Sequence, residues 1–219
     1  ASARDFDWRR TIAANLGNAD PVTGRLLVQD VRFMSRRRRQ NLQWDVIILV
    51  DQSASMASSL LHSAVMASIL AALPGLSVRL ILFDTSVVDV SHLAGDPVEV
   101  LMTCQLGGGT DTSPALEYCR RTITRPSAAV LILISDLYDF SPKRMLEHVA
   151  RIQGDGVRVI VLLTLSDDGL PSYNHEVAAS LGAMGVPAFG CTPDAFPDLI
   201  AAAIQGDDLG RWAEQQAAQ

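Results

Sequence analysis

The chain has 219 residues, of which 48% are apolar and 19% charged, a composition typical of one soluble globular domain. A chain of this length can bury about 70% of the surface that its unfolded form exposes, so it needs no disulfide or structural zinc. Its three cysteines lack CxxC spacing, which argues against both kinds of cross-link and favours a cytoplasmic location. Its apolar runs fall short of the about 18–20 residues of a membrane helix, so we expect no membrane span.

The charge is unevenly distributed along the chain. Residues 1–43 carry nine arginines and four aspartates, a net charge of +5, whereas residues 44–219 carry nine basic and twenty acidic residues, a net charge of −11. The basic run at 36–39 has no interleaved aromatic residues of the kind that stack on nucleic-acid bases. We therefore expect it to face solvent or acidic protein surface, and we expect no nucleic-acid partner.

From residue 44 onward, short apolar runs alternate with longer helix-like stretches, the pattern of an α/β fold with a mostly parallel sheet. The predicted strands are, in chain order, 46–50, 78–83, 87–90, 129–135, 157–164 and 186–189. The predicted helices are 56–73, 97–104, 113–124, one that begins at Ser141 and Pro142, 174–184, and a final helix at 193–205. The unbroken Val, Ile and Leu runs indicate strands that are covered by helices on both faces.

Two local signals refine this architecture. Only residues 84–86 separate the second and third strands, so these strands form a hairpin, and one antiparallel strand lies at the sheet edge. Ser113, followed by Pro114, is the predicted N-cap of its helix. The expected fold is a Rossmann-like three-layer α/β sandwich with a mostly parallel central sheet, one antiparallel edge strand and helices on both faces.

Residues 1–43 depart from this alternation. Residues 9–16 could form a short helix, and residues 26–33 could form an extended strand. The domain organisation that we predict is a basic N-terminal arm or linker at 1–43, the α/β domain at 44–205 and a C-terminal tail at 206–219.

Polar residues follow the two most apolar strands at the point where each strand ends. Asp51, Ser53 and Ser55 follow the first strand, Asp136 follows the strand at 129–135, and the glycines at 107–109 precede Thr110. Ligands of open parallel sheets bind beyond the carboxyl ends of the strands, so these side chains are expected to converge there. Two carboxylates and three hydroxyls form an all-oxygen site for a hard divalent cation, Mg²⁺ first, with Mn²⁺ or Ca²⁺ as alternatives.

The small number of anions in this set indicates what the site does. With only two carboxylates, the cation keeps electrophilic character and has one coordination position open to water or to another molecule. An aspartate or glutamate of a partner protein is the natural sixth ligand.

Each of these residues alone has a structural alternative. Asp51 or either serine could cap the helix that begins near Met56. Asp139 competes with Asp136, but it lies past the strand end and is expected near the start of the next helix. The occurrence of all five residues at the correct ends of their elements favours the metal site.

This combination of Asp-x-Ser-x-Ser after a buried strand, Gly-Gly-Thr before a helix and Asp after the next buried strand resembles the von Willebrand factor A (VWA) family and its metal-ion-dependent adhesion site. The resemblance extends over about 44–205 and includes the edge hairpin. It implies five metal ligands: Asp51, Ser53, Ser55, Thr110 and Asp136. The family often has glycine where this chain has Ala54, and the added methyl group leaves the ligands in place.

The N-terminal arm indicates which branch of the VWA family the chain resembles. Its Asp-Trp-Arg-Arg-Thr-Ile sequence at 7–12, Asn15 and Leu16, and the arginine-rich approach to Trp44 are similar to the bacterial CoxE-like branch of the VWA family. Members of this branch are commonly associated with MoxR-type AAA+ ATPases. The resemblance therefore implies an adaptor or co-chaperone in complex assembly or metalloenzyme maturation, not extracellular adhesion.

Two alternative functions use the same residues. A Mg²⁺-dependent phosphatase or phosphotransferase could use Asp51 as a nucleophile, but such sites place a second aspartate where this chain has Ser53, and the only lysine, Lys143, is poorly placed. A non-catalytic subunit of a metal-chelatase-like AAA+ complex would share the whole site and differ in its client. We predict a binding module and not an enzyme.

Overall fold

The computed structural model describes residues 11, 30, 44–53, 56–73, 75–104, 107–163, 173–191 and 195–217, with the side chains at 57–60 and 215–217 left out. The chain divides into two units, Ala1–Leu42 and Gln43–Gln219. In the first unit Thr11 is helical, as predicted, and Asp30 lies at a bend, whereas the rest of the predicted strand at 26–33 lies outside the described residues. The other predictions for the arm lie outside the described residues.

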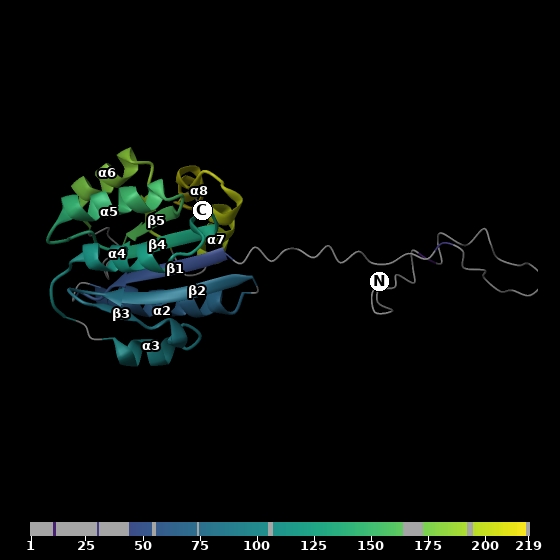
Figure 1. Ribbon diagram of the computed structural model, residues 1–219, viewed down its shortest axis with the longest axis horizontal. Coiled ribbons are helices and arrows are strands. Elements are labelled where there is room, and N and C mark those ends of the chain that lie inside the picture. Colours follow the sequence, from purple (N-terminus) through teal and green to yellow (C-terminus); the bar gives the residue numbers. More distant parts are fainter. Residues whose placement is uncertain are drawn as a thin grey trace, which may run out of the picture. The chain divides into compact units, whose positions relative to one another are not determined.

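A six-stranded sheet forms the centre of the second unit (Figure 1). In spatial order the strands are β3 (Val87–Asp89), β2 (Leu76–Phe83), β1 (Trp44–Asp51), β4 (Ala129–Ser135), β5 (Arg158–Leu163) and β6 (Ala188–Phe189). All neighbouring strands are parallel except β2 and β3, which pair antiparallel at the edge. The predicted edge hairpin is confirmed.

The alternating side chains of β1 supply two separate cores. Val46, Ile48 and Val50 belong to the core on one face of the sheet, and Ile47 and Leu49 belong to the core on the other face. All five side chains are completely buried. Burying each of them contributes roughly 1.5–3 kcal/mol, which is why an unbroken apolar run is favourable in a strand covered on both faces.

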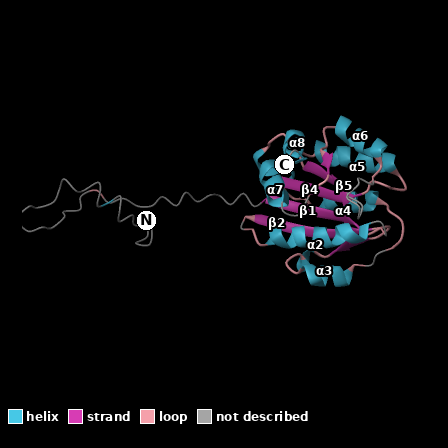
Figure 2. Ribbon diagram, turned by 180° about the vertical axis from the view of Figure 1, so that it is seen from behind, coloured by secondary structure: helices cyan, strands magenta, loops and turns pink. Residues whose placement is uncertain are grey.

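Helices cover both faces of the sheet (Figures 1 and 2). The first core includes side chains of α2 (Ala57–Ala71), α3 (Pro97–Thr103) and α7 (Phe196–Gln205). The second core includes side chains of α4 (Thr112–Thr122), α5 (Pro142–Gly154) and α6 (His175–Ala183). Two 3-10 turns, η4 (Ser91–Leu93) and η5 (Pro126–Ala128), complete the connections. The predicted three-layer α/β sandwich is therefore confirmed.

No helix in the described ranges is both long enough and apolar enough to span a membrane.

The predicted N-cap of α4 is wrong. Asp111 occupies this position, with extended backbone geometry, and its carboxylate accepts a hydrogen bond from the backbone N–H of Ser113 at 3.1 Å. Ser113 lies in the first turn instead, and its buried hydroxyl has no hydrogen-bond partner. Aspartate and serine both cap helices well, so the sequence alone does not distinguish two such residues placed two positions apart.

The helix α7 is not the last helix, contrary to the prediction. Gly206, in the left-handed conformation at φ 87°, ends α7, and α8 (Leu209–Ala217) follows. The carboxylate of Asp208 accepts hydrogen bonds from the backbone N–H groups of Gly210 and Arg211, so it caps α8. Leu209 and Trp212 pack against the first core.

The position of the α4 cap gives a testable prediction. We expect Asp111→Ala to lower the free energy of unfolding by about 1 kcal/mol, because the backbone N–H of Ser113 loses its acceptor. Ser113→Ala should not lower the free energy of unfolding, because its buried hydroxyl has no partner to lose and is itself costly when unpaired. Urea denaturation of the two variants measures both values, and a larger loss for Ser113→Ala would contradict the assignment.

Candidate metal centre

The predicted ligands lie where the strand order of the sheet reverses. The chain passes from β1 to β2 on one side, and β4 pairs with the other side of β1. Such a reversal leaves a crevice at the carboxyl ends of the two central strands. Asp51 is the last residue of β1, and Asp136 directly follows the last residue of β4. The strand ends therefore bring two carboxylates to the same crevice.

Asp51 is completely buried, and its carboxylate is the centre of a hydrogen-bond network. Its Oδ1 accepts from the backbone N–H of Ser53 at 2.8 Å and from the hydroxyl of Thr110 at 3.4 Å. Its Oδ2 accepts from the hydroxyl of Ser135 at 2.9 Å. One side chain thus joins the end of β1, the end of β4 and the loop that precedes α4.

The electrostatic environment of Asp51 favours a positive charge. Burial raises the pKa of its carboxyl group above the ordinary value, and the charge of Asp136 raises it further. Hydrogen bonds from Ser53 and Ser135 lower the pKa and only partly offset these effects. No ion pair among the described residues includes Asp51. A buried carboxylate without a basic partner is costly, and a bound cation would remove this cost.

A constrained turn holds Asp136. Its Oδ1 accepts from the backbone N–H of Tyr138 at 3.1 Å, and its backbone oxygen accepts from the N–H of Asn174 at 2.9 Å. The intervening Leu137 has φ 64°, an uncommon conformation for a residue other than glycine, and it is buried. Its N–H donates to the hydroxyl of Ser135 at 3.0 Å. The turn therefore fixes the carboxylate of Asp136 beside the end of β4.

The glycine-rich loop presents Thr110 through conformations and contacts that a larger residue would not allow. Gly107 and Gly108 have φ values of 147° and 88°. A Cβ atom on Gly109 would lie 2.0 Å from the ring of Phe140. The backbone N–H of Phe140 donates to the backbone oxygen of Thr110 at 3.0 Å, so the loop after β4 and the glycine loop hold each other in place.

Asp139 has the structural role that the sequence predicts. Its Oδ1 accepts from the backbone N–H of Ser141, the N-cap residue of α5, at 2.6 Å. Its Oδ2 accepts from the N–H of Thr112, the first residue of α4, at 2.7 Å. Asp139 therefore holds the starts of two helices, and Asp136 is the carboxylate that lies beside Asp51 in the candidate site.

Four of the five predicted ligands fall within the described residues, and the structure brings all four to this crevice. They are Asp51, Ser53, Thr110 and Asp136, each less than 10% exposed. Ser55 lies outside the described residues. Ser135 was missed as a site residue, although its position next to Asp136 at a strand end was a usable signal. In the described ranges no three His, Cys, Asp or Glu residues cluster as a metal site, so a cation here would need the hydroxyl groups.

Two solved structures share the fold of this chain. One is a multiple-serine variant of an aerotolerance-related membrane protein from Bacteroides fragilis NCTC 9343, with a TM-score of 0.55 and 15% identity over 76% of this chain and 99% of that chain. Another is von Willebrand factor type A from Catenulispora acidiphila, with a TM-score of 0.54 and 16% identity over 71% of this chain and 40% of that chain. At these identities the likeness concerns the fold alone, which is that of VWA domains.

The family model for VWA domain-containing CoxE-like proteins matches residues 1–199, and the chain belongs to this family. The chain is 42% identical over 204 residues to the uncharacterized protein YehP of Escherichia coli strain K12. The match covers 93% of this chain, and the chain spans about half, 54%, of the length of YehP. Proteins with VWA domains generally mediate metal-dependent protein interactions, and neither comparison indicates a catalytic activity.

The raised pKa of Asp51 predicts how the metal-free protein responds to pH. Asp51→Asn should raise the melting temperature of the metal-free protein at about pH 7, because it removes a buried charge. The advantage should shrink as the pH falls through the raised pKa of the folded state, and it should vanish below about 3.9, where the carboxyl group is protonated even in the unfolded chain. Melting curves of both proteins in EDTA at several pH values measure the difference. An advantage that grows toward acid pH would contradict the assignment.

Proposed function

We propose that the chain is a divalent-metal-dependent protein-interaction module that captures an acidic side chain of a partner. The cation, Mg²⁺ first and Mn²⁺ or Ca²⁺ as alternatives, is held by five oxygen ligands: Asp51, Ser53, Ser55, Thr110 and Asp136. The observation that carries the proposal is the buried carboxylate of Asp51, which joins two strand ends and a glycine loop through hydroxyl and N–H groups and has no ion-pair partner among the described residues.

The donor set fits a cation that recognises acids. Carboxylate and hydroxyl oxygens are hard ligands of the kind that Mg²⁺ prefers. Two carboxylates neutralise at most the charge of a divalent ion, and the hydroxyl groups add none. The ligands therefore give the bound cation no net negative charge, and its open coordination position can accept one further anion. An aspartate or glutamate of a partner supplies this anion.

An exposed aromatic rim beside the site supports a protein as the partner. Tyr138 is 57% exposed and Phe140 is 71% exposed, and both follow Asp136 within four residues. The Phe140 ring lies against Gly109, the residue before Thr110. Exposed aromatic side chains beside a charged anchor are typical of residues that contribute strongly to binding between proteins.

For the partner we propose a MoxR-type AAA+ ATPase or its client, with the chain as an adaptor or co-chaperone in the cytoplasm. Membership of the CoxE-like family supports this proposal. In our proposal residues 44–205 form the interaction domain, and the basic arm at 1–43 offers a second contact. A subunit of a metal-chelatase-like complex would use the same surface. No observation favours the phosphatase alternative, since Ser53 replaces its second aspartate and Lys143 is exposed on the first turn of α5.

Metal binding is tested by thermal stability and calorimetry. Mg²⁺ at a hundred times its Kd should stabilise the fold by about 2.7 kcal/mol, which corresponds to a rise of roughly 5–10 °C in Tm. EDTA should reverse the rise, and Asp51→Ala and Thr110→Val should each weaken Mg²⁺ binding at least about tenfold. Asp84→Asn is the matched control, because Asp84 follows β2 at the same edge of the sheet but accepts hydrogen bonds from Ser86. Equal Mg²⁺ affinity in Asp51→Ala and the wild type would refute the site.

The aromatic rim predicts a separation of metal binding from partner binding. Phe140→Ala should weaken Mg²⁺-dependent binding to the purified MoxR-type ATPase of the source organism about tenfold while leaving the Kd for Mg²⁺ unchanged. Met102→Ala is the control, since Met102 is 82% exposed on α3, a helix that packs with the other core. Surface plasmon resonance with Mg²⁺ and with EDTA measures both variants. Binding that EDTA leaves intact would count against the metal as the contact.

A further inference from the structure

The surface of α4 and α5 is basic, although the rest of the domain is strongly acidic. These two helices carry five of the nine basic residues in 44–219 and only two of its twenty acidic residues, a net charge of +3. The remainder of 44–219 has a net charge of −14. The two helices pack side by side on one face of the sheet (Figure 1). This pair of helices is therefore the place on the domain where an acidic partner meets the least repulsion.

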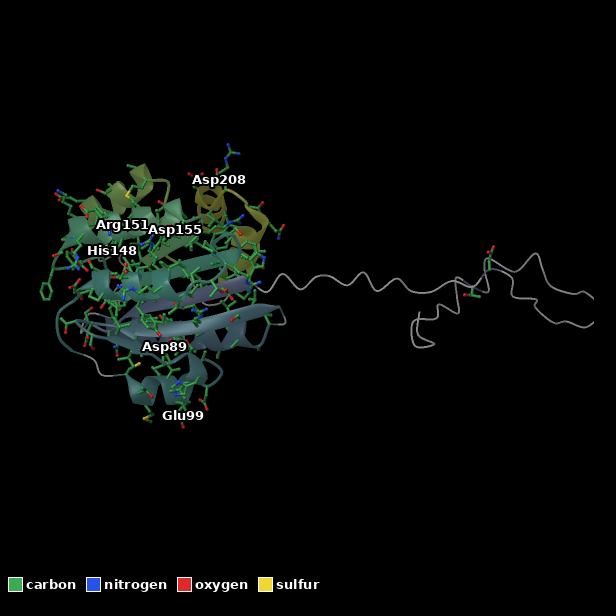
Figure 3. All side chains as sticks on the ribbon, viewed as in Figure 1. Asp89, Glu99, His148, Arg151, Asp155 and Asp208 are labelled. Carbon is green, nitrogen blue, oxygen red and sulfur yellow. The ribbon has the colours of Figure 1, made fainter. Side chains whose placement is uncertain are left out.

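A groove of about 720 Å³ lies between these helices. Its lining includes Ser113, Glu117 and Arg121 of α4 and Arg144, His148 and Arg151 of α5. Arg121 is paired with Glu117 at 2.9 Å. Arg144 and Arg151 are exposed and form no ion pair within the described residues, and Figure 3 shows Arg151 close to His148 on α5. The groove thus has two unpaired positive charges along one wall.

Two buried polar atoms in the groove lack hydrogen-bond partners. The hydroxyl of Ser113 is completely buried, and His148, whose Nδ1 is unpartnered, is 8% exposed. The nearest acceptor to this nitrogen, Oε2 of Glu117, lies 3.7 Å away, beyond hydrogen-bond distance. Nearly all buried polar groups in folded proteins are paired, and leaving one unpaired costs about 1–3 kcal/mol. Two such atoms in one groove point to a ligand that pairs with them.

The ionisation of His148 is consistent with a donor at this position. Burial lowers the pKa of its imidazole, and the positive charge of Arg151 lowers it further, whereas Glu117 acts in the opposite direction. The ring is therefore neutral near pH 7. A neutral imidazole can donate one hydrogen bond to a carboxylate or accept one from a backbone N–H.

We propose that this groove binds an acidic peptide segment of the partner protein. A carboxylate of the segment pairs with Arg144 and Arg151, and its polar groups satisfy the hydroxyl of Ser113 and the imidazole of His148. Glu117 and Glu147 also line the groove and reduce its positive charge, which disfavours a polyanion such as nucleic acid. A segment with single, spaced carboxylates fits this mixed lining.

The groove begins close to the proposed metal site. Ser113 follows Thr110 by three residues, and Arg121 lies eight residues beyond Ser113, a rise of about 12 Å along α4. An extended peptide covers this length with about four residues. The partner segment would have one aspartate or glutamate that binds the metal and a second about four to six residues before or after it. Such a segment would occupy the metal site and the groove at the same time. The part of the inference that links the groove to the metal site rests on the proposed function, but peptide binding to the groove can be tested without metal.

The test uses the ¹⁵N-labelled full chain in EDTA, titrated with a capped six-residue peptide that has glutamate at its first and fifth positions and glycine or serine at the others. We expect amide shift changes in α4 and α5, including Ser113 and His148. Arg144→Glu and Arg151→Glu should each weaken the binding measured at these amides about fivefold or more. Arg211→Glu, a reversal at an 83% exposed residue on α8, should leave it unchanged. The same peptide with glutamine in place of both glutamates should produce no shift changes in the groove.

Three outcomes would overturn the inference: shift changes confined to the basic residues 36–39, equal affinity in Arg144→Glu and the wild type, or equal binding of the glutamine peptide. Circular dichroism and thermal melting confirm that the reversal variants fold. Failure of the metal-site proposal and failure of the groove proposal are distinguishable. If the wild type does not bind Mg²⁺, the metal site is refuted, but peptide binding measured in EDTA is unaffected.

Discussion

The structure depends on one energetic constraint, a carboxylate buried at the point where the sheet reverses its strand order. Asp51 has no basic partner among the described residues, so its burial is tolerated only through hydrogen bonds from Ser53, Thr110 and Ser135. Each donor comes from a different part of the site. The same bonds that reduce the cost of the charge also fix the relative positions of the two strand ends and the glycine loop. A site that is costly when empty and rigid in geometry is well suited to bind a cation.

The elements that surround this site follow from simple sequence signals because their physical causes are local. Strands β1 and β4 are covered on both faces, so each is an unbroken apolar run. The antiparallel edge strand follows from a link too short for any other connection. The convergence of Asp51 and Asp136 follows from one rule, that parallel strands in one sheet end at the same edge, and the glycine-rich loop before α4 brings Thr110 to them.

The cap of α4, the helix α8 and the groove cannot be predicted from local sequence signals. Asp111 and Ser113 are both good helix caps, and the structure uses Asp111, whose carboxylate reaches a backbone N–H while the hydroxyl of Ser113 stays unpaired. The helix α8 is absent from the predictions because it is short and polar on average, and it is fixed by its Asp208 cap and by the packing of Trp212 against the first core. The groove requires α4 and α5 to lie side by side, which only the packing of both helices on the sheet determines.

Asp139 fixes the distance between the start of α4 and the start of α5. One oxygen of its carboxylate holds the first residue of α4, and the other holds the N-cap residue of α5. The two helix starts are thereby joined to each other within a few residues of Thr110 and Asp136. Together with the bond from the N–H of Phe140 to the backbone oxygen of Thr110, Asp139 thereby restrains the separation between the crevice and the basic groove. A surface of this kind would select a partner by the spacing between its acidic residues, and many sequences with the right spacing would satisfy it.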